Sequence, residues 1–532
     1  MSIYSTKKKY AWMMLFYFAL GILIRWPTIP FIYTLPLESN TPLHALAALG
    51  LRDGYILSLP YLEFPDGANV RYIAWPLLIV TGFCNLFLSP IPAMNVGVFL
   101  WIVLQGIGAY IIGQKLQFSH IGALICGVLC MCSTTILQAN GNGQFENISM
   151  MSLLWLYWAL ETSEQNLKKG CFHIAISFAL TLFSSPYQGV VALCMIGVHL
   201  LYTYRWKVLI PIIPSLLVGA WYFGAVSQGN VHASVTPAHA SITESARLYG
   251  FLIPQNIAEN GGTPLMGPLG RLHNLRNLPR SMIYSNRWPW LMSTATDYIG
   301  IVLFFVGIYG IWMKKNVKIF TMLIMITVIS MGQQISMANI TIPLPWSLSK
   351  WIPGIQNMQA TLRFLSGVSI FLGIAMCQVI SSKKWGFIIL FLLLLDFFLI
   401  APHNWPVQAY EPILSPELQR IKAKNSPVAY WPSAPVIASH KVTTTALILQ
   451  IPLATFHHPK LTMPNEIGDI NNQIFIDDAK TWLHKIKEQD IDTLLQFRDM
   501  VGSQSQPFFS HYEQCDEYYC SWNIKEESYD SK

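Results

Sequence analysis

The first 31 residues, MSIYSTKKKYAWMMLFYFALGILIRWPTIPF, place a basic head in front of a long apolar run. Lys7–Lys9 precede roughly 20 mostly aliphatic and aromatic residues, the length that crosses a bilayer as a helix. No small-residue cleavage site follows, because Arg25–Pro27 stand where such a site would fall. We therefore predict an uncleaved first membrane span over residues 11–33.

The composition extends this interpretation to most of the chain. Of its 532 residues 53% are hydrophobic and 11% are charged, and the mean hydropathy is +0.41. A soluble domain carries about 25% charged residues. The shortage of charge is confined to the first 400 residues or so, and ordinary polar sequence returns at Pro402. We predict a membrane body over residues 1–402 and a soluble extracytoplasmic domain over residues 403–532.

Ten further apolar runs approach the length of a membrane span, so the predicted fold is an all-α polytopic membrane protein of about 11 helices with a small C-terminal α/β domain. These runs lie at residues 93–114, 119–139, 147–163, 171–185, 187–204, 207–226, 298–313, 317–337, 363–381 and 385–402.

Residues 70–91 form one more apolar stretch, and the positive-inside rule decides whether it crosses. If it does not, every short basic loop falls on the side of Lys7–Lys9. We therefore predict that it dips in and returns or lies along the interface, that the N-terminus is cytoplasmic, and that the long loops 34–92 and 228–297 and the tail lie outside. The short-loop basic residues are Lys115, Lys168, Lys169, Arg205, Lys207, Lys314, Lys315, Lys318, Lys383 and Lys384.

These lysines also account for much of the net charge of +7, which therefore does not indicate nucleic-acid binding. In the tail, residues 427–432 and 491–497 are typical of strands, and residues 477–488 of an amphipathic helix. Cys515 and Cys520 share the polar segment CDEYYC and can close a disulfide in an oxidising compartment. They can also be read as half of a zinc site, but no second pair of zinc spacing accompanies them.

The first outer loop carries several acids. Glu38 follows the first span and precedes a short amphipathic helix over residues 42–51, while Asp53 and Asp66 stand farther along. A carboxylate that is partly desolvated at the membrane surface gains a raised pKa and can act as a general base. Each of these acids can equally be a helix cap or a solvated surface charge.

A second acid follows a glycine-rich loop. In NGNGQFEN, residues 140–147, the glycines allow the backbone to approach a ligand closely, and Glu146 stands at the mouth of a helix. The helix dipole alone would also favour an acid there.

Basic residues gather in the outer loop 228–297. GRLHNLRNLPRSMIYSNRW holds Arg271, His273, Arg276 and Arg280, and Arg363 stands at the mouth of a later span. Arginine forks suit phosphate groups, and a cation at the start of a span needs a partner or a bound anion. Lipid headgroups, salt bridges and snorkelling to the interface are the alternatives.

Four features in this order resemble the GT-C superfamily of membrane glycosyltransferases, and within it bacterial YfhO-type membrane proteins. They are an acid soon after the first span (Leu37-Glu38-Ser39), a Pro/aromatic dip (Pro65-Asp66-Gly67 to Trp75-Pro76), an acid at the outer end of the third span (Gly143-Gln144-Phe145-Glu146), and a Pro-Trp to Arg-Phe entry to a late span (Pro345-Trp346 to Arg363-Phe364).

The resemblance implies a hexosyltransferase-type enzyme with Glu38 as the base and Glu146 as the second acid; Asp66 and Asp53 are the next candidates. The donor would be a polyprenyl-phosphate sugar, its phosphate held by the arginines with His273 nearby, and the acceptor a glycan, lipid or protein. The superfamily usually has Asp in the first loop, where this chain has Glu. No Asp-x-Asp pair occurs in the predicted membrane body, residues 1–402, so no cofactor or metal is indicated.

Two other functions compete with this one. A transporter or flippase would need ionisable residues in the middle of several spans and symmetric broken helices, and neither is evident. A non-catalytic assembly factor of the same fold is also consistent with the exchange of Asp for Glu. The location implied in each case is a membrane, and by resemblance the bacterial inner membrane.

Overall fold

We describe the chain from a computed structural model. The structure describes residues 3–36, 41–55, 58–59, 68–69, 74–143, 145, 148–229, 298–337, 340–351, 361–401, 409–412, 414–430, 440–450, 453–455, 488, 491, 493–497, 514–515 and 519–523.

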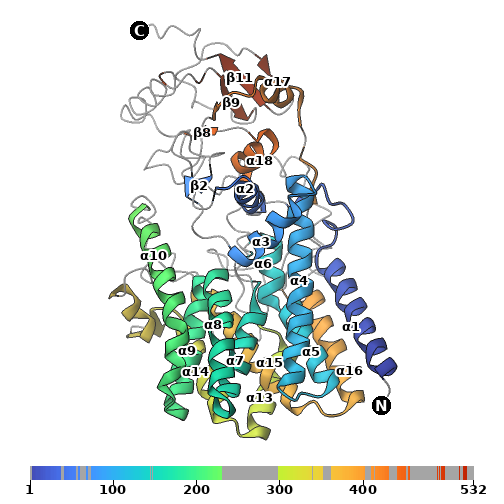
Figure 1. The fold of residues 1–532 in the computed structure, drawn as a ribbon, viewed down its shortest axis with the longest axis vertical. Helices are drawn as coiled ribbons and strands as arrows, with labels where there is room; N and C mark the ends of the chain where they lie inside the picture. The colour runs from blue at the N-terminus through green and yellow to red at the C-terminus, as the bar shows by residue number, and fades with distance from the viewer. Residues whose placement is uncertain are drawn as a thin grey trace.

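A helical bundle forms the larger part of the molecule (Figure 1). Each predicted apolar run contains helix. The helices are α1 (Ile3–Ile24), α4 (Pro90–Lys115), α5 (His120–Cys132), α6 (Thr134–Asn142), α7 (Met150–Gln165), α8 (Leu167–Ser184), α9 (Pro186–Thr203), η2 (Trp206–Ile212), α10 (Ile213–Gly229), α13 (Ile301–Lys314), α14 (Val317–Ser330), α15 (Leu365–Val379), α16 (Lys383–Leu395) and the π-helical η8 (Asp396–Ile400).

Three helical stretches in the described residues are long and apolar enough to cross a membrane, namely Pro90–Lys115, His120–Asn140 and Pro186–Thr203. Several shorter apolar helices accompany them. The apolar composition and these helices together indicate an integral membrane protein. The number of helices that cross stays a prediction.

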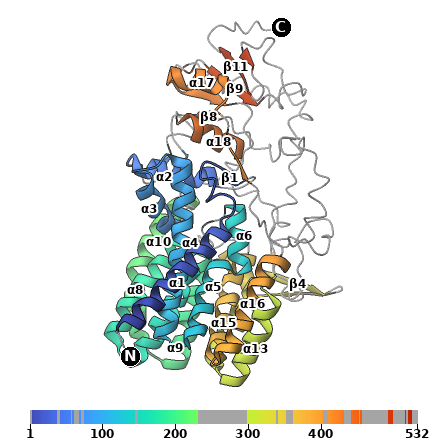
Figure 2. The ribbon, with the colours of Figure 1, turned by 90° about the vertical axis from the view of Figure 1, so that its right-hand side faces the viewer.

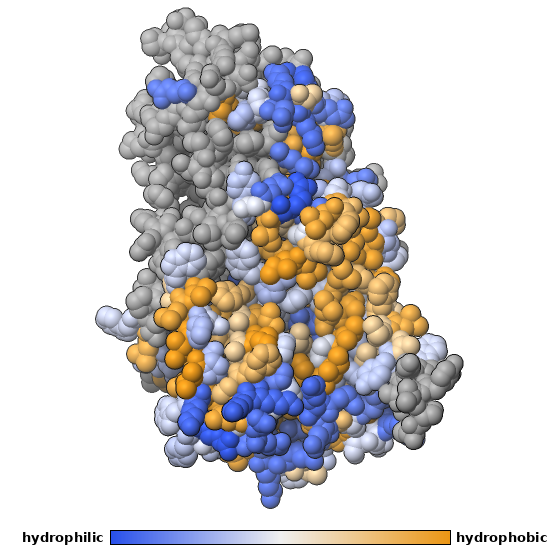
Figure 3. All heavy atoms as spheres, viewed as in Figure 1, coloured by the Kyte–Doolittle hydropathy of each residue, from blue (hydrophilic) through white to orange (hydrophobic). Residues whose placement is uncertain are grey.

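The two ends of the bundle differ in polarity. The helices run up and down, so that the short basic turns lie at the end where the chain begins, and the C-terminal sheet lies beyond the other end (Figures 1 and 2). In Figure 3 a hydrophilic band covers the first end, and an apolar belt lies above it. The short basic loops therefore lie at one end of the bundle, as inferred from their lysines.

The first helix is shorter than the predicted span. α1 ends at Ile24, and residues 25–33 continue as turns, in which Ile29 N–H donates to the Arg25 carbonyl at 3.2 Å. Pro27 and Pro30 have no backbone N–H to offer a helix, so the regular ladder cannot extend through them. The chain then reaches the short strand β1 (Leu35–Pro36).

Two short helices lie at the end of the bundle that faces the sheet, α2 (Thr41–Arg52) and α3 (Trp75–Cys84). The amphipathic helix predicted at residues 42–51 is thus present. α3 has 10 residues, a length of about 15 Å, half of what a bilayer requires. A dip rather than a crossing is consistent with this length.

Smaller elements complete this end of the molecule. They are the hairpin of β2 (Ser58–Leu59) and β3 (Ala68–Asn69), the hairpin of β4 (Gln334–Met337) and β5 (Ile340–Pro343), and the 3₁₀ helices η6 (Pro345–Trp351) and η7 (Thr361–Phe364).

Close helix packing depends on small residues. A Cβ atom on Gly310 of α13 would lie 2.2 Å from the Ala375 carbonyl oxygen of α15, and one on Gly127 of α5 would lie 2.0 Å from the Tyr17 hydroxyl of α1. Such close approach is the usual way in which membrane helices associate. Of the seven cysteines in the apolar helices, six are buried and Cys171 is half-buried.

The tail contains a five-stranded sheet in the order β10-β11-β9-β7-β8. Its elements are β7 (Val428–Tyr430), β8 (Leu453–Thr455), β9 (Thr493–Phe497), β10 (Gln514–Cys515) and β11 (Tyr519–Asn523), with the helices α17 (Pro416–Lys424) and α18 (His440–Leu449).

β7 runs parallel to β8 and β9, whereas β11 is antiparallel to β9 and β10. Strands are present in both segments where the sequence predicts them, while the predicted helix at 477–488 falls outside the described residues except for Glu488. The register pairs Cys515 with Cys520 directly. Residues so paired have Cα atoms about 4.5–5.5 Å apart, within the range of a disulfide, which itself stays a prediction.

Two contacts join the tail to the first outer loop. β1 pairs with β6 (Ala409–Tyr410) in antiparallel register, with Leu35 opposite Tyr410. α18 packs against α2, which Figure 1 shows directly beneath it. The first outer loop is therefore held between the bundle and the sheet.

Candidate functional site

A buried arginine organises the end of the bundle that faces the sheet. Arg25 follows α1 and has no exposed surface. Its Nη1 donates to the Asn140 side-chain oxygen of α6 at 2.7 Å, and its Nη2 donates to the Asn95 side-chain oxygen of α4 at 2.8 Å. Its Nε has no hydrogen-bond partner. Within the described residues, this cation is bound by neutral amides and forms no ion pair.

The two asparagines that accept from Arg25 also donate hydrogen bonds to backbone carbonyls. Asn95 Nδ2 donates to the carbonyls of Ile32 at 2.9 Å and Thr34 at 2.7 Å, just before β1. Asn140 Nδ2 donates to the Ile24 carbonyl at 3.3 Å. Asn95 and Asn140 are almost fully buried, so these bonds are not exchanged with water.

An aromatic contact closes the same region. The Phe145 ring has no exposed surface and lies 6.0 Å from the Arg25 guanidinium carbon. The His44 ring of α2 meets Phe145 edge-on, with centroids 5.1 Å apart. Burial lowers the pKa of His44 to about 4, although a hydrogen bond with the Gly143 backbone acts in the opposite direction.

The predicted acids Glu38, Glu146 and Asp66 lie outside the described residues. Residues near Glu38 and Glu146 in sequence are described. Glu38 stands in sequence between the buried residues Pro36 and Thr41, and Glu146 directly follows Phe145. The contact of His44 with Phe145 joins α2 to the residue before Glu146, and the positions of the acids themselves stay predictions.

Asp53 lies apart from this contact. It follows the far end of α2, and its carboxylate accepts a hydrogen bond from Arg52 Nε at 2.7 Å. Arg52 is eight residues beyond His44, about 12 Å along the helix. In the structure Asp53 is thus part of an accessible ion pair with Arg52, away from the His44–Phe145 contact.

Of the predicted phosphate-binding residues, Arg271, His273, Arg276 and Arg280 lie outside the described residues. Arg363 is described. Its guanidinium carbon lies 5.1 Å from the Tyr187 ring centroid at the start of α9, and Phe364 contacts both Tyr187 and the buried Trp346. The cation at the mouth of this span is therefore stabilised by an aromatic face.

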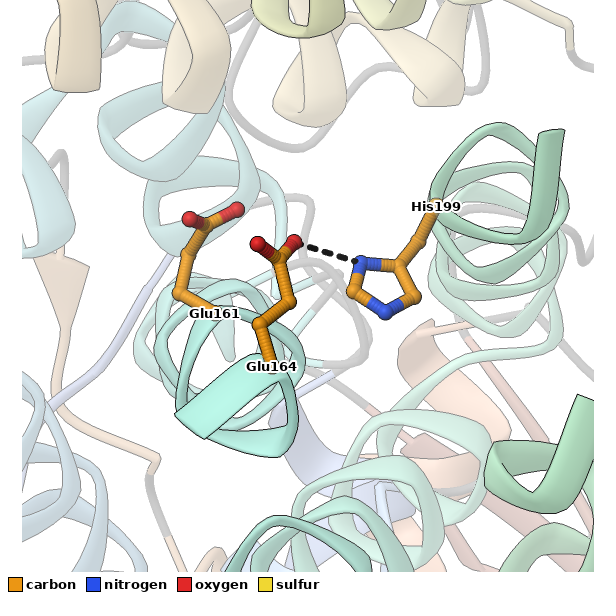
Figure 4. A group of neighbouring side chains, drawn as sticks. All are labelled: Glu161, Glu164 and His199. Atoms are coloured by element: carbon orange, nitrogen blue, oxygen red, sulfur yellow. Dashed lines mark ion pairs between the residues drawn. The ribbon is translucent and has the colours of Figure 1, made fainter. Parts of the chain in front are cut away.

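A different charged cluster lies at the opposite end of the bundle (Figure 4). Glu161 and Glu164 of α7 and His199 of α9 place three possible metal ligands within 4.8 Å of one another. Lys318 Nζ, however, already donates to Glu161 at 2.6 Å and to Glu164 at 2.7 Å. His199 Nδ1 lies 3.7 Å from Glu164. The cation at this position is the lysine ammonium, so the cluster ties together the ends of α7, α9 and α14.

The acid in the last span is also paired. Asp396 is buried and accepts a short hydrogen bond from the Tyr298 hydroxyl and a 3.0 Å bond from the Val302 backbone N–H. It thereby satisfies the N-terminal turn of α13 from a neighbouring helix. Gly300 has φ +105°, and a Cβ there would lie 3.0 Å from the carboxylate. We assign Asp396 a structural role.

No protein-family model matches the chain, and neither does any curated protein. Solved structures do. The cryo-EM structure of the mycobacterial arabinofuranosyltransferase AftD matches with a TM-score of 0.50 at 14% identity, over 93% of this chain and 35% of the other. A point mutant of the same enzyme gives a TM-score of 0.52 at 14% identity, over 93% and 37%.

The chain shares the fold of AftD. AftD is an arabinofuranosyltransferase, so the likeness to glycosyltransferases inferred from the sequence is confirmed at the level of the fold. At this identity the likeness shows the fold alone. The chain spans about a third of the length of the AftD chains that it matches.

Three residues of the site around Arg25 and Phe145 were not proposed as functional from the sequence, namely His44, Asn95 and Asn140. Arg25 lies inside the predicted first span, where a cation needs a partner, but the sequence does not identify that partner. A usable signal was present, because an amide side chain inside an apolar helix needs a hydrogen-bond partner. The sequence could not show that both amides share one partner.

Proposed function

We propose that the protein is a membrane glycosyltransferase that works at the end of the bundle that carries the C-terminal sheet. The observation that carries the proposal is the contact of His44, in the helix that follows Glu38 in sequence, with Phe145, the residue before Glu146, within a fold shared with AftD. Acids that enter one site from two loops suit general-base chemistry.

In this proposal Glu38 takes the proton of the acceptor hydroxyl while that oxygen attacks the anomeric carbon of the donor sugar. The bond to the donor phosphate breaks, and the phosphate leaves with the bonding electrons. Glu146 orients the acceptor or the sugar from the facing loop, and Asp66 and Asp53 are the next candidates for the base. Catalysis then depends on proton removal, orientation and charge stabilisation.

The donor in the proposal is a polyprenyl-phosphate sugar, and the acceptor is a glycan, lipid or protein. Arg363, together with Arg271, Arg276, Arg280 and His273, supplies positive charge for the phosphate. Arg363 supports this role because its guanidinium lies against the Tyr187 ring at the start of α9, at the mouth of a span. The cell envelope of a bacterium, with the sheet outside the cytoplasm, is the location that we propose.

The test is sugar transfer in proteoliposomes that contain the full chain. Glu38→Gln should lower the rate by about 100-fold or more, since that is the usual contribution of a general base. Hexose and pentose polyprenyl phosphates would be compared as donors, because the hexose specificity is itself part of the proposal.

The matched control is Glu411→Gln, the same chemical change at an exposed carboxylate of the tail. It should leave the rate unchanged. If Glu38→Gln transfers sugar as fast as the unaltered protein, Glu38 is not the base. If the unaltered protein transfers no sugar from any donor, the non-catalytic role gains support.

A further inference from the structure

Arg25 connects parts of the chain that are far apart in sequence. Its two amide partners are 70 and 115 residues away. One branch runs from Nη2 to Asn95 and on to the carbonyls of Ile32 and Thr34, the residues that lead into β1. This branch therefore fixes the backbone immediately before the first outer loop.

The other branch runs from Nη1 to Asn140, near the end of α6. The same guanidinium lies 6.0 Å from the Phe145 ring, beyond the end of that helix. The guanidinium thus contacts Phe145, whose ring also meets His44 of α2. Because a guanidinium is rigid and planar, its two acceptors are held at a fixed angle to each other.

Stability alone does not explain this arrangement. A buried cation costs free energy unless it is well paired, and Arg25 forms no ion pair with any residue in the described part of the chain. Apolar groups of similar volume commonly replace buried charges without loss of stability. The arrangement does supply a fixed geometry, because each atom that Arg25 holds is itself bonded to a further segment.

We infer that Arg25 is a positioning residue, which with Asn95 holds the segment at residues 32–36 at a fixed separation from the segment that runs from Asn140 to Phe145. The inference rests on the proposed function in one respect, namely that these segments lead to the proposed acids. The geometric part of it stands without that function.

Asn95→Asp separates the two roles of Asn95. The carboxylate keeps an acceptor for Arg25 and gives it a counter-charge, but it cannot donate to the Ile32 and Thr34 carbonyls. Asn140→Asp is the matched comparison, because it also keeps the acceptor for Arg25 and loses only the 3.3 Å bond to Ile24. Tyr17→Phe is the general control, since it removes a buried hydrogen bond of α1 to the Leu124 carbonyl.

The first readout is backbone hydrogen exchange measured by mass spectrometry on the full chain in lipid nanodiscs. Asn95→Asp should raise the exchange rate of a peptide covering residues 31–36 by about tenfold, the effect of about 1.4 kcal/mol in a local opening equilibrium. Asn140→Asp should have a smaller effect on that peptide, and Tyr17→Phe should have none.

The second readout is sugar transfer. Asn95→Asp should lower kcat by about 10- to 100-fold with little change in KM, because a small misplacement slows the chemical step more than it weakens binding. Arg25→Lys, which keeps the charge but not the fork, should fall between Asn95→Asp and the unaltered protein. Tyr17→Phe should keep the full rate.

The outcomes distinguish the two proposals. Unchanged exchange over residues 31–36 in Asn95→Asp overturns the positioning role, whatever the activity. Faster exchange with an unchanged kcat overturns the catalytic consequence of positioning. Faster exchange in a protein that transfers no sugar, altered or unaltered, overturns the proposed function and leaves the geometric inference standing.

Discussion

His44 is a buried histidine whose surroundings disfavour the protonated, charged imidazole. It lies in α2 against Phe145, and burial lowers the pKa of its imidazole to about 4. In the unfolded chain the same group has a pKa of about 6.5. The folded protein therefore keeps His44 neutral at a pH where the unfolded chain would bind a proton.

The sign of the pH dependence follows. Between about pH 6.5 and about pH 4 the unfolded state binds one more proton than the folded state, so the free energy of unfolding falls as the pH falls. From about pH 7 to about pH 5 this group should cost the folded state about 2 kcal/mol. A thermal-unfolding series in detergent over this range should show the loss. His44→Gln, which cannot titrate, should show less of it, and equal losses in the two proteins would contradict the prediction.

Sequence reasoning reached some of this site and missed the rest for a physical reason. Arg25 was recognisable because a cation in an apolar run is costly and needs a partner. Its partners were not recognisable, since Asn95 and Asn140 belong to other helices and only the packing of α1, α4 and α6 brings them to it. Local sequence indicates which groups need partners, whereas the packing of the helices determines which partners they find.

At the scale of elements, Lys318 shows how one side chain can join three helices. Its ammonium bonds to two carboxylates of α7 from the start of α14, and His199 of α9 faces Glu164 from the other side. Removal of the ammonium leaves two neighbouring carboxylates without a positive charge between them, which is unfavourable.

Lys318→Met should therefore lower the free energy of unfolding by about 1–2 kcal/mol, discounted for the partial exposure of both glutamates. The three ligands left behind suit a divalent cation. Added Mn²⁺ should raise the thermal midpoint of Lys318→Met and leave that of the unaltered protein unchanged. Equal stabilisation of both would show that Lys318 does not hold this position against metal.

The positions of elements were easier to predict than their ends. Apolar runs located the bundle helices, because burial in lipid demands them whatever the details. The end of α1 was predicted too late by nine residues, since an apolar composition continues through Pro27 and Pro30 where helical hydrogen bonding cannot. The basic residues of the short loops correctly predicted that these loops lie at one end of the bundle. Neighbouring helices run in opposite directions, so the loops that join them in pairs meet at the same end.

At the scale of the whole molecule, the tail is joined to the bundle through the first outer loop. Leu35 of β1 is opposite Tyr410 of β6, and α18 packs on α2. No local pattern predicts these contacts, because β1 and β6 have two residues each and are 370 or more residues apart in sequence. The residues just before β1 are in turn held from the bundle side, because Asn95 donates to the carbonyls of Ile32 and Thr34 and accepts from Arg25. The tail, through β6, and the buried arginine, through Asn95, thus hold adjacent parts of one short segment.

The pairing of β1 with β6 can be tested by a cross-link. Directly opposed residues in antiparallel strands have Cα atoms about 4.5–5.5 Å apart, a separation that a disulfide can bridge. The double variant Leu35→Cys with Tyr410→Cys should therefore form an interstrand disulfide under mild oxidation, detected as a linked peptide by mass spectrometry without reduction. Leu35→Cys with Glu411→Cys is the matched control, because the second cysteine then points to the other face of the strand. Linkage in the control alone would mean a register shifted by one residue. The absence of linkage in both would mean that the tail is not anchored at β1, and that the first outer loop is held from the bundle side alone.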